Sequence, residues 1–102
     1  MTTPITWHRA ADLEELADGA VKPFTAGTLA MVLCRLGSKY GALEDRCPHA
    51  GGPLSQGSIE NGLLVCPWHG REYDPLTGHC EGYQSVMAHP VEVRHDGIFV
   101  AA

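Results

Sequence analysis

The chain has 102 residues, of which 44 % are hydrophobic and 19 % charged, so it can form one domain with a small core. Its 12 acidic and 7 basic residues give a net charge of −5, which disfavours nucleic acid and anionic membranes as partners. No run approaches the roughly 20 apolar residues that cross a bilayer, and we expect no secretory signal. We therefore expect a soluble cytoplasmic protein, in which four cysteines are more often metal ligands or buried thiols than disulfides.

Twelve glycines and seven prolines favour short strands joined by turns. In chain order, the predicted strands cover residues 6–9, 21–24, 28–36, 40–44 and 63–66, followed by a hairpin with arms 90–93 and 98–100. Residues 12–19 have the signals of a single helical turn. The run 28–36 is almost entirely apolar, which suits a strand buried on both faces. We expect no internal repeat.

The segment from Cys47 to Gly82 differs from the rest, because glycine, proline, histidine and cysteine gather in it. It contains CPHAGG (residues 47–52) and CPWHG (residues 66–70), and each copy offers one thiolate and one imidazole. A single Cys-x-His pair arises easily by chance, and a buried thiol is usually a small hydrophobe. Two copies with the same Cys-Pro start and flanking glycines indicate a metal or cluster site. Zinc accepts the same donors, although zinc modules usually draw two like ligands from each loop.

These motifs resemble those of Rieske iron–sulfur proteins: C-x-H followed, after a spacer, by C-x-x-H. Gly70, Tyr73, Asp74, Thr77 and Gly78 match downstream, as does the hairpin near the C-terminus. The resemblance implies an all-β fold, a Rieske-like antiparallel β-sandwich with a small loop-built cluster-binding subdomain. It also implies a single domain over residues 1–102, with the cluster-binding subdomain at about 45–82.

The implied cofactor is one Rieske-type 2Fe–2S cluster. Cys47 and Cys66 would bind one iron and His49 and His69 the other. Neutral imidazole ligands make the cluster less negative than an all-cysteine cluster, which raises the potential to about −150 to +300 mV.

Four more residues are expected next to the cluster. Tyr73 would donate a hydrogen bond to a ligand sulfur, Trp68 would shield the cluster, and Gly51 and Gly52 would bring backbone N–H groups near the sulfides. High-potential family members have a disulfide where this chain has Gly52 and Trp68, and a serine where it has Arg71. We therefore expect a potential in the lower half of the family's range.

The resemblance implies a one-electron carrier rather than an enzyme, similar to the ferredoxins of bacterial aromatic-ring dioxygenase systems. Such a carrier works as a monomer and passes electrons from a flavin-dependent NAD(P)H reductase to a terminal oxygenase. An oxygenase would need a second, mononuclear iron domain, for which 102 residues leave no space. The alternatives are a small subunit of a larger oxidoreductase, such as a nitrite-reductase-type complex, and a colourless zinc-stabilised interaction module.

Several other residues near the motifs lie outside the ligand pattern. Cys34 is expected to be a core thiol, and Cys80 has no expected ligand role. The segment 81–86 corresponds to a loop that often carries a proline in the family, but none is present here. Either a solvated rim or a docking surface is compatible with the charged residues that flank the ligand loops: Asp45, Arg46, Glu60, Arg71 and Glu72.

Overall fold

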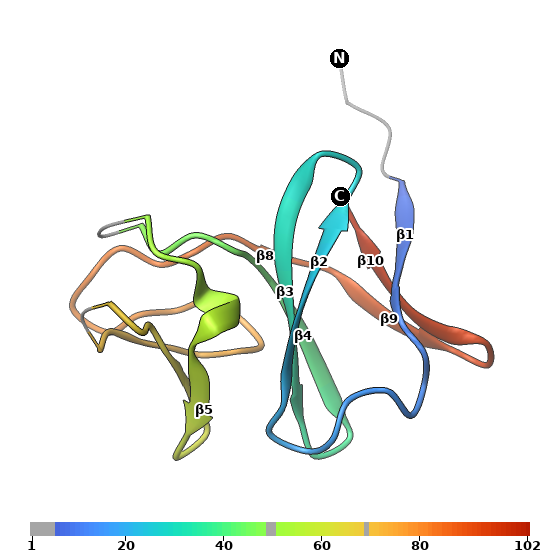
Figure 1. The fold of residues 1–102 in the computed structure, drawn as a ribbon, viewed down its shortest axis with the longest axis horizontal. Helices are drawn as coiled ribbons and strands as arrows, with labels where there is room; N and C mark the ends of the chain where they lie inside the picture. The colour runs from blue at the N-terminus through green and yellow to red at the C-terminus, as the bar shows by residue number, and fades with distance from the viewer. Residues whose placement is uncertain (1–5, 49–50, 69) are drawn as a thin grey trace.

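The computed structural model describes residues 6–48, 51–68 and 70–102 (Figure 1). Within these residues, the strands pair antiparallel in three sheets. The first sheet has the order β1 (Trp7–Ala11), β10 (Gly97–Ala101), β9 (Val91–Arg94). The second has the order β2 (Val21–Ala26), β3 (Leu29–Leu36), β4 (Lys39–Glu44), β8 (Ala88–His89). The third has the order β5 (Ser58–Glu60), β6 (Leu63–Val65), β7 (Glu72–Tyr73), and the short 3-10 helix η1 (Leu54–Gln56) precedes it.

Strand β3 is buried on both faces, as its apolar run predicts. Met31, Val32, Leu33 and Cys34 all have 0 % exposure. Because side chains alternate along a strand, Met31 and Leu33 face one core and Val32 and Cys34 the other. The second sheet is therefore the middle layer of the molecule.

The two cores join this middle layer to different partners. One core includes Ile98 and Val100 of β10, so it holds the first and second sheets together as a sandwich. The other includes Cys47, Leu64 and Tyr73, which belong to the loops and third sheet on the opposite side. In Figure 1 this second part, coloured green to orange, extends to the left of the sandwich.

Gly41 of β4 brings the two parts into close contact. A Cβ atom at this position would lie 1.9 Å from the carbonyl oxygen of Pro75. Only glycine allows the chain at Pro75 to lie so near to the strand. The segment after β7 is thus seated directly on the sandwich.

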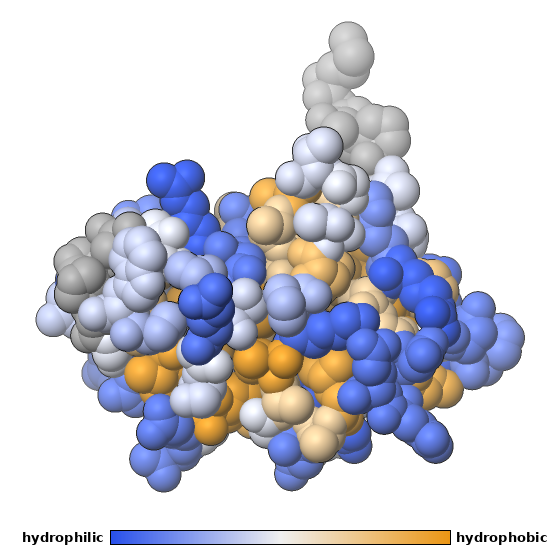
Figure 2. Space-filling model, in the orientation of Figure 1, coloured by the Kyte–Doolittle hydropathy of each residue, from blue (hydrophilic) through white to orange (hydrophobic). Residues whose placement is uncertain are grey.

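The outer surface differs from these cores. On the face shown in Figure 2, strongly hydrophilic residues cover much of the right-hand part, where β1, β9 and β10 lie, and hydrophobic atoms show along the lower middle. No helix in the described part of the chain is long and apolar enough to span a membrane.

The predicted all-β antiparallel fold is confirmed, and each predicted strand is present with shifted ends. Residues 12–19 form turns and bends without a regular helix, and the Glu15 N–H donates to the Asp12 carbonyl over 3.2 Å in a single turn. The Arg35 side chain donates to the Leu16 carbonyl, and the Gly19 N–H donates to the Arg35 carbonyl, so the segment is held against the end of β3. The sequence analysis missed η1, β5, β7 and β8, which are two or three residues long.

Candidate metal centre

The two predicted cysteine ligands lie in the same core. Cys47 follows β4 and Cys66 follows β6, and their exposures are 0 % and 1 %. The structure therefore gathers two sulfur atoms from loops that are distant in sequence. The predicted ligands His49 and His69 lie outside the described residues.

Two backbone hydrogen bonds close loop 1 (residues 47–52), and we call this pair of bonds the backbone frame of the loop. The Cys47 N–H donates to the Gly52 carbonyl over 2.8 Å, and the Gly51 N–H donates to the Cys47 carbonyl over 2.7 Å. Gly51 has a φ of 75°, which is the left-handed conformation that glycine adopts at low cost. The frame thus begins at the cysteine and ends five residues later.

Loop 2 (residues 66–71) repeats this frame. The Cys66 N–H donates to the Arg71 carbonyl over 2.8 Å, and the Gly70 N–H donates to the Cys66 carbonyl over 3.0 Å. Gly70 has a φ of 72° and occupies the same fifth position as the left-handed glycine of loop 1. Both loops therefore present a cysteine at their first position.

Loop 3 (residues 74–79) has the frame a third time. The Asp74 N–H donates to the His79 carbonyl over 2.8 Å, and the Gly78 N–H donates to the Asp74 carbonyl over 2.7 Å. Each loop also has proline second and glycine fifth: CPHAG, CPWHG and DPLTG. The same six-residue turn therefore occurs three times, and its third copy was not part of the sequence-based prediction.

Asp74, the first residue of loop 3, shows that a side chain at the first position of the loop can accept backbone hydrogen bonds. An oxygen of the Asp74 carboxylate accepts the N–H groups of Leu76, at 2.8 Å, and Thr77, at 3.3 Å. This is how an N-cap residue satisfies the N–H groups of a helical first turn. Cys47 and Cys66 have sulfur atoms in place of this carboxylate.

Tyr73 lies beside the sulfur of Cys47, one of the predicted ligands. Its side chain is buried, and its hydroxyl is 3.1 Å from the Cys47 sulfur. Burial, followed by the hydrogen bond with Cys47, raises the pKa of the Tyr73 hydroxyl far above its usual range. The hydroxyl therefore stays protonated and can donate a hydrogen bond to a sulfur that carries negative charge.

Trp68 and Gly52 lie against each other, although Trp68 remains 55 % exposed. A Cβ atom at Gly52 would lie 2.7 Å from Cδ2 of the Trp68 indole. The predicted roles of Trp68 as a shield, and of Gly51 and Gly52 in bringing backbone N–H groups to the sulfides, stay predictions.

The other two cysteines are buried as well. Cys34 lies in β3, where burial and then the charge of Asp45 raise the pKa of its thiol to about 12. Cys80 belongs to the same core as the two predicted ligands, and burial raises the pKa of its thiol. Both thiols therefore stay protonated at neutral pH.

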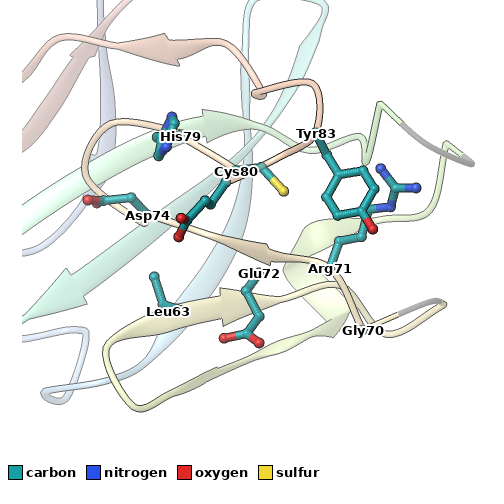
Figure 3. Close-up of a pocket in the computed structure, with 9 residues that line it drawn as sticks. Leu63, Gly70, Arg71, Glu72, Asp74, His79, Cys80 and Tyr83 are labelled. Carbon is teal, nitrogen blue, oxygen red and sulfur yellow. The ribbon is translucent and has the colours of Figure 1, made fainter.

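Beside loop 2 lies an open cavity of about 570 Å³ (Figure 3). At one side of it the Arg71 guanidinium stacks over the Tyr83 ring, 3.7 Å from the ring centre. This stack joins loop 2 to the segment that follows Cys80. No local sequence pattern indicates it, and the sequence analysis missed it. The cavity is lined by Leu63, Gly70, Arg71, Glu72, Asp74, His79, Cys80, Glu81 and Tyr83.

Asp45 has a structural role among the charged residues that flank the loops. Its carboxylate accepts the Ser55 N–H over 2.7 Å and the Ser55 hydroxyl over 2.6 Å. These bonds tie the end of β4 to η1. Asp45 is thus neither a free rim residue nor a free docking residue.

The described residues fit a cluster with thiolate ligands. Two cysteines share one core, and a tyrosine that keeps its proton lies beside one of them. The equivalent position of loop 3 holds an anionic group that accepts backbone N–H groups, which shows that the frame tolerates negative charge there.

Comparisons with known proteins point to one family. The description "Rieske [2Fe-2S] domain" matches residues 6–93. The vanillate O-demethylase oxygenase subunit of Pseudomonas sp. is 40 % identical over 83 residues, which cover 69 % of this chain. The chain spans less than a quarter of the length of several curated relatives, including 24 % of that oxygenase subunit.

Two shorter proteins match over more than nine tenths of their length. Ferredoxin CarAc of Metapseudomonas resinovorans is 24 % identical over 99 residues, which cover 93 % of this chain and 92 % of CarAc. The solved ferredoxin of carbazole 1,9a-dioxygenase from Nocardioides aromaticivorans IC177 superposes with a TM-score of 0.86 at 27 % identity. That match covers 93 % of this chain and 96 % of the ferredoxin.

Proposed function

Because this chain belongs to the Rieske 2Fe–2S domain family and carries one Rieske-type cluster, we propose that it is a one-electron carrier. In this proposal it accepts electrons from a flavin-dependent NAD(P)H reductase and donates them to a terminal oxygenase. It makes and breaks no substrate bonds itself. The carrier works as a monomer in the cytoplasm, where NAD(P)H is available to the reductase.

The observation that carries this proposal is the fold match to a dioxygenase ferredoxin, with a TM-score of 0.86 at 27 % identity. The superposition covers 96 % of that ferredoxin, so nearly every part of it has a counterpart here. The same fold within an oxygenase subunit accounts for only a quarter of the subunit's length. The proposed single domain extends over residues 1–102, with the cluster-binding subdomain at about 45–82.

The proposed ligands are Cys47 and Cys66 on one iron and His49 and His69 on the other. The bound cluster supplies a reversible one-electron step. The first position of loops 1 and 2 directs each cysteine into a buried core, where water has little access to the sulfur. Low access keeps the solvent reorganisation that accompanies electron transfer small.

Tyr73 is the proposed residue that tunes the potential. A hydrogen bond from its hydroxyl to the Cys47 sulfur draws negative charge away from that thiolate. The reduced, more negative state gains most from this bond, so Tyr73 raises the potential. With Arg71 in place of a second hydroxyl donor, the potential is still expected in the lower half of about −150 to +300 mV.

A second candidate is an electron-transfer part of a larger oxidoreductase, such as a nitrite-reductase-type complex. It is favoured by the relatives of which this chain spans less than a quarter. Gel filtration of the native protein from its own cells separates the two candidates. Elution at the mass of a single chain supports the free carrier, whereas elution with a large partner supports the subunit.

The carrier function is tested by stopped-flow electron transfer. The visible bands of the purified protein should bleach when NADH and a flavin-dependent ferredoxin reductase are added. They should return when an oxygenase with its substrate and oxygen follows. A protein that the reductase leaves oxidised, although dithionite reduces it, would contradict the proposed position in the chain of electron transfer.

A further inference from the structure

Among the described residues, the Trp68 ring of loop 2 lies against Gly52 of loop 1. A Cβ atom built on Gly52 would lie 2.7, 2.9 and 3.2 Å from Cδ2, Cγ and Cε2 of Trp68. Cδ2 and Cε2 form the bond that the two rings of the indole share, so the middle of the ring system lies against the Gly52 backbone. Real Cβ atoms do not approach carbon this closely, and a side chain at position 52 would have to displace the ring.

The backbone frame does not require glycine at this position. Loops 2 and 3 have Arg71 and His79 at the equivalent sixth position, so the frame accepts large side chains there. The φ of Gly52 also lies outside the left-handed region, unlike that of Gly51. The Trp68 ring is therefore the feature of the described structure that explains why residue 52 has no side chain.

The contact acts next to both predicted cysteine loops. Gly52 closes loop 1, because its carbonyl accepts the Cys47 N–H over 2.8 Å. Trp68 follows Cys66 by two residues and directly precedes His69 in the sequence. Its 55 % exposure shows that the ring is not simply a core residue. The ring therefore contacts the residue whose carbonyl holds the start of loop 1.

We propose that the Trp68 indole is a clasp that sets the separation of loops 1 and 2, and that position 52 must be glycine to admit it. Trp68 and Gly52 are positioning residues in this inference, since they act through the proposed ligands rather than on the cluster. The clasp role rests on the proposed function, because it assigns the two loops to one cluster. Its benefit is slower loss of that cluster.

A double-mutant cycle tests the clasp. The variants are Gly52→Ala, Trp68→Ala and the two together, and the measured quantity is the rate at which visible absorption is lost in the presence of an iron chelator. Each single change should speed this loss about tenfold, and the double variant should match Trp68→Ala within about twofold. If Gly52→Ala speeds cluster loss by the same factor in the Trp68→Ala background as in the native protein, the clasp proposal is wrong. In that case glycine serves some other approach, such as that of the backbone to the cluster.

If the Gly52→Ala protein takes up no cluster at all, cluster uptake by the double variant still tests the proposal. Restored uptake supports the clasp, and an empty double variant overturns it. Gly41→Ala is the matched control, because its Cβ would meet the backbone oxygen of Pro75 and removal of Trp68 cannot relieve that clash. Trp7→Ala, a change to the tryptophan of β1, should leave the rate of cluster loss unchanged.

Fluorescence separates this inference from the proposed function. In a Trp7→Phe background Trp68 is the sole tryptophan, and Gly52→Ala should increase the quenching of its emission by acrylamide about twofold, because the ring loses its support. Unchanged quenching overturns the contact whether or not iron is bound. A native protein without iron overturns the proposed function, whereas an additive cycle in an iron-loaded protein overturns the clasp alone.

Discussion

Loop 3 and the two cysteine loops have the same backbone frame but different first residues. In loop 3 the Asp74 carboxylate accepts the N–H groups of Leu76 and Thr77, so the loop satisfies its own donors. In loops 1 and 2 the first residue is a cysteine, whose sulfur is a softer and weaker acceptor in a neutral thiol. A thiolate bound to iron would carry the negative charge that Asp74 provides in loop 3.

Loop 3 thus has a charged acceptor at its first position, whereas loops 1 and 2 gain a charge there when their cysteines bind iron as thiolates. Loop 3 also packs against Gly41 of the sandwich, whereas loops 1 and 2 contact each other through Trp68 and Gly52. We therefore expect loop 3 to keep its structure when the cluster is absent and loops 1 and 2 to lose theirs. The following changes test this contrast.

The largest effect is expected from the first position of the cysteine loops. Cys47→Ser and Cys66→Ser should each abolish cluster uptake, because serine remains a neutral hydroxyl and is a poor ligand for iron in this setting. Iron per chain and visible absorption would fall to background. Cys34→Ala is the matched control, since it removes an equally buried thiol that has no ligand role and should retain the cluster.

Replacing the glycine at the fifth position with alanine should destabilise the protein more in loop 3 than in loop 2. Gly70 and Gly78 have φ values of 72° and 78°, so alanine costs each about 1–2 kcal/mol in backbone strain. A Cβ at Gly78 would also lie 2.1 Å from the Val86 carbonyl oxygen, whereas nothing lies within 4 Å at Gly70. Gly70→Ala should lower the apparent melting temperature by about 4–16 °C, and Gly78→Ala should lower it by more than twice as much as Gly70→Ala does. Equal decreases in melting temperature would show that loop 3 is not closely packed at Gly78.

Removal of the Asp74 carboxylate should weaken loop 3 by a smaller amount. Asp74→Ala leaves the N–H groups of Leu76 and Thr77 without their acceptor, at a cost of about 1 kcal/mol, or about 4–8 °C in melting temperature. Asp74→Asn still offers an oxygen and should retain most of the stability. Both variants should keep the visible spectrum of the native protein. An alanine variant as stable as the asparagine variant would contradict the capping role.

The smallest expected effect concerns the potential rather than the presence of the cluster. Tyr73→Phe removes the hydroxyl that lies 3.1 Å from the Cys47 sulfur, and the midpoint should fall by tens of millivolts. Protein-film voltammetry measures this shift directly. Tyr40→Phe, a change to a tyrosine of β4, is the control and should leave the midpoint unchanged. No shift in the Tyr73 variant would contradict its donor role.

The sequence predicts well what local patterns encode. The apolar run around Val32 predicts a strand with two buried faces, and the repeated Cys-Pro signals the two cysteine loops. Strands β7 and β8 have two residues each, which is too short for a local periodicity to be detected. Only pairing with β6 and β4 defines them as strands.

Loop 3 is visible in the sequence, because DPLTG has the same proline and glycine positions as CPHAG and CPWHG. Asp74, Thr77 and Gly78 match the family pattern, but that match alone does not predict a third copy of the turn. The contacts of Trp68 with Gly52 and of Arg71 with Tyr83 could not be predicted, since each joins residues more than ten positions apart. They depend on how the loops are packed, not on any local preference.

Pulsed EPR of the dithionite-reduced protein, grown with nitrogen-15 histidine, tests the proposed mixed ligand set most directly. We predict the signal of one reduced 2Fe–2S cluster with couplings to the ring nitrogens of two histidines, His49 and His69. The absence of an iron–sulfur signal, or a signal without histidine couplings, would contradict that ligand set.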